Sequence, residues 1–239
     1  MTPLPNRLAP YAGALLLLQG LTACSSENNS ANQTIAEAPL AQANASASAE
    51  AADSRLVVAF GDSLYAGYGV LPQESFPARL EKALVARGVA ARVRNAGVSG
   101  DTSSAGLRRL AFTLDGLDRK PDLVMVNLGG NDMLRGIDPG ETRANLTAIC
   151  EELKRRGIPI LLTGMIAAPN MGRDYAERFN PIYPELAKRY DAALYPFFLD
   201  GVVTDQKLML PDRIHPNPAG IDAIVAKVAP LVAGSLDSD

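Results

Sequence analysis

The side chains best suited to chemistry in this chain are one serine and the single histidine. Ser63 follows residues 56–60, a run of five apolar residues that predicts a strand buried on both faces. His215 is the only histidine, and Asp212 stands three residues before it. A serine hydroxyl needs a base to take its proton, and histidine suits that task near neutral pH. The residue types favour Ser63 as a nucleophile, His215 as its base and Asp212 as the carboxylate that orients the imidazole.

The rest of the chain predicts the elements that must position these residues. Further apolar runs predict strands over residues 91–96, 122–128, 158–163 and 194–198. The stretches between them predict amphipathic helices that begin after Ser75, after a cap at Asp101, at Pro139 and at Pro218, with another stretch that Pro181 and Pro184 should divide. Alternating strands and helices indicate a three-layer α/β domain, with a parallel sheet and helices on both of its faces.

In such a sheet every strand-to-helix loop lies at the same edge, which is where ligands bind. Ser63, Gly100, Asn131 and His215 all belong to loops of this kind. Each of the four also has an ordinary interpretation: a turn cap, a common loop glycine, a left-handed turn residue and a surface histidine. Their convergence on one edge favours a catalytic site over four unrelated loop residues.

Composition excludes several other classes of protein. The 239 residues are 47% hydrophobic, with a net charge of −3, which suits one well-packed domain and gives no reason to expect nucleic acid as a partner. No apolar run approaches the roughly 20 residues of a membrane span. With one histidine and two cysteines, we expect neither a bound metal nor any other cofactor, and no disulfide framework. Cys150 falls on the apolar face of a predicted helix and is interpreted as a buried hydrophobe.

The amino-terminal segment has the layout of an export signal. Residues 1–24 combine one charge, a short apolar core and the sequence Leu21-Thr22-Ala23-Cys24, which resembles a bacterial lipobox. We expect Cys24 to be lipidated and to anchor a periplasmic protein in a membrane. By resemblance to sorted lipoproteins, this membrane is the outer membrane. The alternative is an ordinary cleaved signal sequence. Residues 25–53 are rich in Ala, Ser, Asn and Gln and predict a disordered tether. The catalytic domain then covers residues 54–239, and we expect a monomer.

The chain resembles a known family of hydrolases, the SGNH-hydrolase (GDSL) superfamily. The resemblance rests on the blocks Gly61-Asp62-Ser63-Leu64, Gly100, Gly129-x-Asn131-Asp132 and Asp212-x-x-His215. It implies a flavodoxin-like sheet of five parallel strands in the order 2-1-3-4-5. It also implies that Ser63 is the nucleophile, that His215 is the general base and then acid, and that Asp212 orients the imidazole. The implied oxyanion hole consists of the backbone N–H groups of Ser63 and Gly100 with the side-chain amide of Asn131.

Within that superfamily the chain is most similar to the bacterial periplasmic group with acyl-CoA thioesterase, lysophospholipase and arylesterase activities. This similarity implies a hydrolase of carboxylic esters and thioesters with lipid-like or aryl substrates. Two alternatives stay open: a carbohydrate O-acetyl esterase, and a tethered binding lipoprotein without catalytic activity. Tyr65 departs from the family, which more often has a small residue there, and is expected to narrow the acyl entrance. Four residues could line an acyl groove or simply pack under a loop: Met165, Ile166, Met171 and Tyr175.

Overall fold

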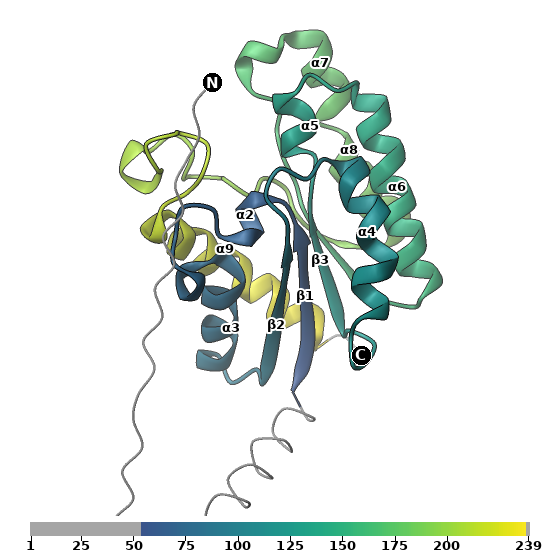
Figure 1. Cartoon of the computed structure of the whole chain (residues 1–239), viewed down its shortest axis with the longest axis vertical. Coiled ribbons are helices and arrows are strands. Elements are labelled where there is room, and N and C mark those ends of the chain that lie inside the picture. The colour runs from purple at the N-terminus through teal and green to yellow at the C-terminus, as the bar shows by residue number, and fades with distance from the viewer. Residues whose placement is uncertain (1–53, 238–239) are drawn as a thin grey trace, which may run out of the picture. The chain divides into compact units, whose positions relative to one another are not determined.

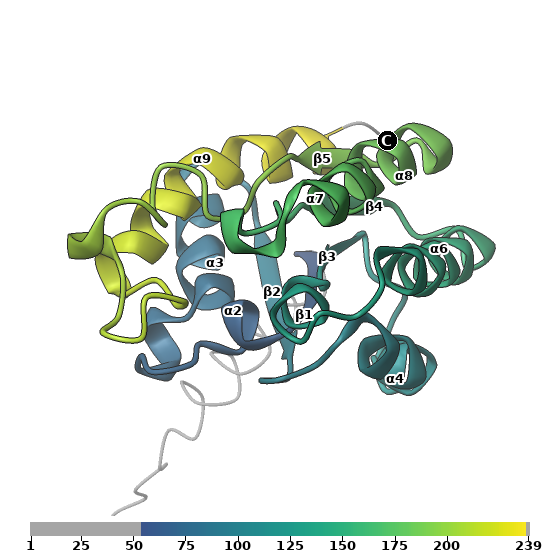
Figure 2. The ribbon, with the colours of Figure 1, turned by 90° about the horizontal axis from the view of Figure 1, so that it is seen from above.

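A computed structural model describes residues 54–237 of the chain. It contains a five-stranded parallel sheet in the order β2-β1-β3-β4-β5, so the expected flavodoxin-like order is confirmed (Figures 1 and 2). The strands are β1 (Arg55–Gly61), β2 (Ala91–Gly97), β3 (Leu123–Asn127), β4 (Ile160–Thr163) and β5 (Ala193–Tyr195). The predicted signal sequence (1–24), its cysteine Cys24 and the predicted tether (25–53) lie outside the described residues.

Helices cover both faces of the sheet (Figures 1 and 2). One face carries α3 (Phe76–Ala86) and α9 (Pro218–Leu236), which pack against each other. The other face carries α4 (Ser103–Asp115), α6 (Pro139–Arg155) and α8 (Ile182–Tyr190). Shorter helices lie in the loops: α2 (Ser63–Ala66), α5 (Gly130–Leu134), α7 (Arg173–Phe179) and the 3₁₀ turns η1 (Pro72–Glu74), η2 (Pro169–Met171) and η3 (Gln206–Leu208).

Strands β1 and β3 are apolar between Arg55, which begins β1, and Asn127, which ends β3, because they are covered from both sides. Val57, Val58 and Phe60 of β1 have no exposed surface, and neither have Val124 and Met125 of β3. Asp138 and Asn217 cap α6 and α9 by accepting hydrogen bonds from backbone N–H groups, each with a proline directly after the cap, as their sequences predict. The rigid central strands give the loops at their carboxyl ends fixed starting points.

Several predicted boundaries were wrong. Strands β3 and β4 are shorter than the predicted ranges 122–128 and 158–163. Strand β5 ends at Tyr195 rather than at residue 198, because its regular pairing with β4 stops at the Thr163–Tyr195 pair, and beyond it Gly164 donates to Tyr195 and accepts from Phe198. Phe198 is fully buried although it lies beyond the strand. Its apolar side chain extended the sequence pattern that predicts a strand. Helix α4 is capped by Thr102, whose Oγ1 accepts a hydrogen bond from Ala105, while Asp101 instead pairs with Arg109 at 2.6 Å.

Helix α9 differs from the expectation that no apolar run approaches a membrane span. Of the described residues, this one helix is long and apolar enough to cross a membrane by length and composition alone. In the fold it packs against α3 and β5, and Ile224, Val228 and Val232 are fully buried. Its apolar character is therefore used in the core of the domain. 

Candidate active site

The three residues predicted to act together lie in direct hydrogen-bond contact. The Nε2 atom of His215 lies 2.9 Å from the Oγ atom of Ser63, although the two residues are 152 positions apart in the chain. The Nδ1 atom of the same ring lies 2.7 Å from the Oδ2 atom of Asp212. In this arrangement an imidazole can take a proton from the hydroxyl while the carboxylate steadies the resulting positive charge.

The loop that carries Asp212 and His215 is held by its own backbone. Leu210 donates to the carbonyl oxygen of His215 at 2.8 Å, and Arg213 donates to that of Leu210 at 2.9 Å. The Oδ1 atom of Asp212 accepts hydrogen bonds from the N–H groups of Ile214 and His215, both at 3.0 Å. Partial burial opposes ionisation of Asp212, but these bonds and the one to the imidazole hold the pKa of Asp212 below its usual range. The carboxylate that faces the imidazole therefore stays charged.

Ser63 is the first residue of α2, one position after Asp62, which caps that helix through a 3.0 Å bond from the N–H of Leu64. Position 61, just before them, requires a glycine for a steric reason. A Cβ atom at this position would lie 2.7 Å from the carbonyl oxygen of Asn127 and 2.9 Å from the ring of Tyr65. The backbone of Gly61 stays in the strand conformation, so the requirement is for space and not for an unusual φ. 

The side chain of Asp62, next to Ser63 in the chain, is buried. Burial, together with the nearby charges of Asp101 and Asp132, raises the pKa of Asp62 to about 7 against the hydrogen bonds from Leu64 and Asn131. Sequence reasoning gave Asp62 no role. Its place between a residue that ends β1 and the candidate nucleophile was the only signal in the sequence, and its burial could be known only from the fold.

At the site, the backbone N–H groups of Ser63 and Gly100 are among those with no acceptor in the part of the chain that the structure describes. Both residues line the same cavity as His215. Gly100 has φ +84°, a conformation that side-chain-bearing residues rarely adopt, so a glycine is needed there. Its carbonyl oxygen accepts a 2.7 Å hydrogen bond from Nη2 of Arg135. That bond ties the loop after β2 to the end of α5.

Asn131 lies in α5 and is not the left-handed turn residue of the alternative interpretation. The residue with a positive φ in this segment is Gly129. Its side-chain Nδ2 donates to the carbonyl oxygen of Asp101 at 3.0 Å and to Oδ2 of Asp62 at 3.3 Å. Both hydrogens of the Asn131 amide are therefore engaged, and the longer of the two hydrogen bonds goes to the carboxyl group of Asp62. For Nδ2 to donate to a bound anion, it must share or exchange one of these bonds.

A cavity of about 410 Å³ opens over these groups. Four predicted site residues line it, namely Ser63, Gly100, Asn131 and His215, and Asp212 lies behind the imidazole. The ring of Tyr68 packs on that imidazole, with 4.4 Å between the ring centroids. The remaining walls are mostly apolar and come from α5, the loop after β4 and the loop before α9: Met133, Leu134, Met165, Ala168, Leu199, Val203 and Ile214.

Comparison with known proteins identifies the family. The model of the GDSL-like lipase/acylhydrolase family matches residues 59–223. The chain belongs to this family. It is accordingly a GDSL hydrolase, an enzyme that cleaves ester bonds, and its parallel sheet is the one found in SGNH-hydrolase structures.

Individual relatives of this GDSL hydrolase are esterases. An arylesterase of Vibrio mimicus is 39% identical over 173 residues, which are 72% of this chain and 84% of that protein. The thioesterase 1/protease 1/lysophospholipase L1 of Escherichia coli is 40% identical over 188 residues, 77% of this chain and 87% of that protein. The crystal structure of AlinE4, an SGNH-hydrolase family esterase, is 52% identical and covers 77% of this chain and 97% of its own, with a TM-score of 0.66.

The structure decides two questions that the sequence left open about the acyl side of the hydrolase. Tyr65 does not narrow the entrance, because its side chain is fully buried, stacks on Phe76 and bonds to Thr163 Oγ1 at 2.9 Å. Of the four candidate groove residues only Met165 lines the cavity. Ile166 is exposed outside it, and the hydroxyl of Tyr175 donates instead to the carbonyl oxygen of Ile137. Tyr65 and Tyr175 thus belong to the packing of the domain.

A buried network behind Asn131 was not found from the sequence. Asp132 has no exposed surface, and its carboxylate accepts hydrogen bonds from the backbone and hydroxyl of Ser103 and from the hydroxyl of Thr142. Asn145 donates to the same Ser103 hydroxyl at 3.0 Å. These bonds join α5 to the start of α4 and to α6. The network fixes α5, and through α5 it fixes Asn131.

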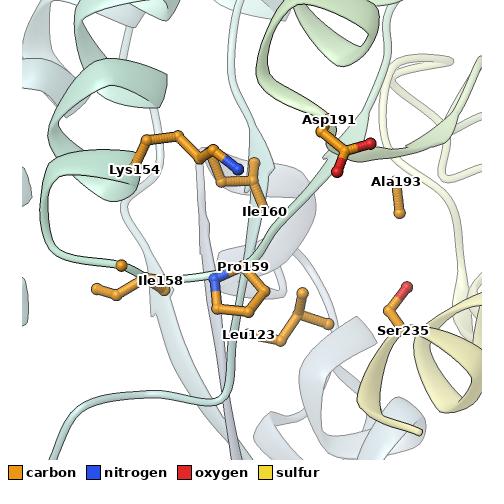
Figure 3. Close-up of a pocket in the computed structure, with 9 residues that line it drawn as sticks. Leu123, Lys154, Ile158, Pro159, Ile160, Asp191, Ala193 and Ser235 are labelled. Carbon is orange, nitrogen blue, oxygen red and sulfur yellow. The ribbon is translucent and has the colours of Figure 1, made fainter. Parts of the chain in front are cut away.

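A second cavity lies at the opposite edge of the sheet (Figure 3). It is larger, about 510 Å³, and begins at the first residues of three strands, Leu123, Ile160 and Ala193. Figure 3 shows Lys154, Asp191 and Ser235 on its walls. Ser235 donates its hydroxyl hydrogen to the carbonyl oxygen of Leu231, and no histidine lines the cavity. It therefore lacks a nucleophile with a base, and the candidate active site is the cavity over Ser63.

Within residues 54–237, no group of three or more His, Cys, Asp or Glu side chains is arranged to hold a metal ion. Cys150 is fully buried on α6, and burial raises the pKa of its thiol to about 12. The thiol is therefore in its neutral, unreactive form.

Proposed function

We propose that this chain hydrolyses carboxylic esters and thioesters with lipid-like or aryl substrates, through a covalent acyl-enzyme on Ser63. The observation that carries this proposal is the hydrogen-bonded series from Ser63 Oγ to His215 Nε2, at 2.9 Å, and from His215 Nδ1 to Asp212, at 2.7 Å. The mostly apolar cavity above the hydroxyl suits a substrate with a hydrophobic acyl or aryl part. Relatives named arylesterase, thioesterase and lysophospholipase support the same class of substrates.

The proposed reaction has two halves. Ser63 Oγ attacks the carbonyl carbon of the substrate while His215 Nε2 takes the hydroxyl proton. The tetrahedral intermediate then collapses, and His215 returns this proton to the departing oxygen or sulfur. A water molecule next gives a proton to His215 and attacks the acyl carbon of the acyl-enzyme. His215 then returns this proton to Ser63 Oγ as the bond from Oγ to the acyl carbon breaks, and the acid is released. Asp212 keeps Nδ1 protonated throughout, so that Nε2 is free to accept.

Negative charge develops on the carbonyl oxygen in both halves, and fixed donors must face it. The N–H groups of Ser63 and Gly100 have no other acceptor among residues 54–237, which leaves them available. Asn131 is the proposed third donor. Its 3.3 Å bond to Asp62 is the weaker of its two, so it is the bond that Nδ2 would share with the substrate oxygen.

A serine-reactive phosphonate tests the chemistry directly. We expect covalent labelling of the wild-type protein and none of Ser63→Ala. Ser235→Ala, at the opposite edge of the sheet, is the matched control and should label fully. Equal labelling of Ser63→Ala would refute the proposed nucleophile. Absence of labelling in the wild type would favour a binding protein without catalytic activity.

A series of oxygen and sulfur esters with acyl chains of about two to sixteen carbons defines the substrate. We expect hydrolysis of both classes and a preference for chains longer than acetyl, because the cavity walls are mostly apolar. A strict preference for acetyl would instead indicate a carbohydrate O-acetyl esterase.

We also propose that the protein is an exported, monomeric lipoprotein of the periplasm, anchored in the outer membrane through Cys24. The support is the sequence of residues 1–24, in which an apolar core precedes Leu21-Thr22-Ala23-Cys24. Cys24→Ala should release the protein from the membrane fraction into the soluble periplasm. Membrane association that is unchanged in this variant would contradict the anchor, and a dimer in sedimentation would contradict the monomer.

A further inference from the structure

The proposed active-site cavity contains one cationic side chain. Arg213 stands between Asp212 and His215 in the chain and is the only Lys or Arg among the described residues that line the cavity. It is exposed, and its guanidinium has no hydrogen bond or ion pair with another residue in the range 54–237. Most other arginines of the domain are engaged; Arg109, for example, pairs with Asp101, and Arg178 pairs with Asp138.

The backbone of Arg213 is also unusual. Its φ is +58°, one of two positive values at non-glycine residues in the described chain. Such a conformation costs a residue with a side chain about 1 kcal/mol or more, which a glycine at the same place would avoid. The position nevertheless carries a long charged side chain at the mouth of the catalytic cavity. Arg213 also lines an adjoining hollow of about 410 Å³ with Val203 and Leu210, so space for a polar group lies next to the site.

The proposed mechanism says which part of a substrate meets this charge. His215 must protonate the leaving oxygen or sulfur, so the alcohol or thiol part of the substrate lies on the imidazole side of Ser63. Arg213 is on the same loop as that imidazole, two residues away. Met133 and Leu134 of α5 and Met165 of the loop after β4 also line the cavity, and these apolar side chains suit the acyl part. A negative group bound by Arg213 therefore belongs to the leaving group.

We propose that Arg213 determines specificity by binding a phosphate group on the leaving part of the substrate. Guanidinium binds phosphate oxygens through two parallel hydrogen bonds, which makes arginine the better choice than lysine for this task. The two sources of such a group are the glycerophosphate of a lysophospholipid and the phosphates of a coenzyme A thioester. This inference rests on the proposed function, since it takes the leaving group to pass His215.

Matched pairs of substrates test the inference. Octanoyl glycerol 3-phosphate is compared with the neutral octanoyl glycerol, and octanoyl-CoA with the neutral octanoyl thioester of N-acetylcysteamine. For Arg213→Gln we expect KM to rise about three- to tenfold for the two phosphorylated substrates at low salt, and to stay within about twofold for the neutral ones. The difference should shrink at about 0.5 M salt, because the charge is exposed and screened. Arg213→Lys should keep part of the preference.

Arg92→Gln is the control, because Arg92 is exposed on β2, opposite Leu56 at the beginning of β1 and away from the cavity. It should leave all four KM values unchanged. A response of only the glycerol pair or only the thioester pair assigns the phosphate to that source, and either result supports the inference. Equal changes with charged and neutral substrates, or no change with any, overturn it while leaving the proposed function intact. If the wild type cleaves none of the four, the proposed function fails as well.

Discussion

His215 Nδ1 and Asp212 Oδ2 lie 2.7 Å apart, on a loop in which only two residues separate them. The other oxygen of the same carboxylate accepts two backbone N–H groups of that loop. Asp212 therefore has two tasks: it folds the loop, and it selects the form of the imidazole in which Nδ1 carries a proton. The two tasks use different oxygens of the carboxylate, Oδ1 for the loop and Oδ2 for the imidazole.

Asp212→Asn should separate these tasks. The amide oxygen can still accept the N–H groups of Ile214 and His215, but the amide nitrogen then faces Nδ1 and forces the ring proton onto Nε2. Nε2 can then no longer take the proton of Ser63, and we expect kcat to fall by about 10³–10⁴. Initial-rate assays with a chromogenic ester measure this fall in kcat. Asp205 caps η3 by accepting a hydrogen bond from the backbone N–H of Lys207. Asp205→Asn is therefore the control and should keep full activity.

Asn131→Ala removes one proposed donor to the developing oxyanion. We expect kcat to fall by about 10²–10³ with little change in KM, since the donor acts on the transition state and not on the bound substrate. Steady-state kinetics on one ester suffice. A kcat equal to that of the wild type would remove Asn131 from the oxyanion hole.

Arg135 should act on the same oxyanion through Gly100. Its 2.7 Å bond to the Gly100 carbonyl holds the loop that presents the Gly100 N–H, although Arg135 itself does not line the cavity. For Arg135→Met we expect kcat to fall about three- to tenfold while the melting temperature stays nearly constant, because the bond is exposed. Arg135→Lys should restore part of the rate. If melting temperature fell and kcat did not, Arg135 would serve stability alone.

Asp62 should make stability depend on pH in a direction opposite to that of Asp212. Burial raises the pKa of Asp62 to about 7. Between about pH 4 and 7 the folded protein therefore keeps a proton on Asp62 that the unfolded chain has released. The contribution of Asp62 to the free energy of unfolding decreases as the pH rises through this window. Asp62→Asn stays neutral, so its urea unfolding midpoint should fall less between about pH 5 and 8 than that of the wild type.

The exposed carboxylate Asp118 provides the control for that measurement. Asp118→Asn should follow the wild-type dependence on pH. If Asp62→Asn and the wild type gave parallel curves, the buried carboxyl group would not titrate in this range.

Tyr65→Phe tests whether this side chain belongs to the core or to the substrate site. Its hydroxyl bonds to Thr163 Oγ1 at 2.9 Å in a fully buried place, so removing it should lower the free energy of unfolding by about 1 kcal/mol. The preference for acyl-chain length should not change, because Tyr65 does not line the cavity. Urea denaturation and the ester series measure the two effects. A shifted chain-length preference would contradict the buried position.

Much of the fold could be predicted because its pattern is local. Apolar runs mark β1 and β3, and proline after Asp138 or Asn217 marks the first turn of a helix. Where a boundary depends on a partner far along the chain, local pattern was insufficient. Strand β5 stops at Tyr195 because its regular pairing with β4 stops at Thr163, although the buried Phe198 beyond it still donates to the carbonyl oxygen of Gly164.

The sequence by itself determined which chemistry this protein can perform: a single histidine, a serine after the first strand and an aspartate three residues before the histidine leave few alternatives. Tertiary structure decided everything that depends on distance and burial. It placed Tyr65 in the core, buried the acid Asp62 next to the serine, and left Arg213 without a partner in the described chain among the residues that line the cavity. Residue type sets what a group can donate or accept, but its pKa and partners depend on the neighbours that folding brings to it.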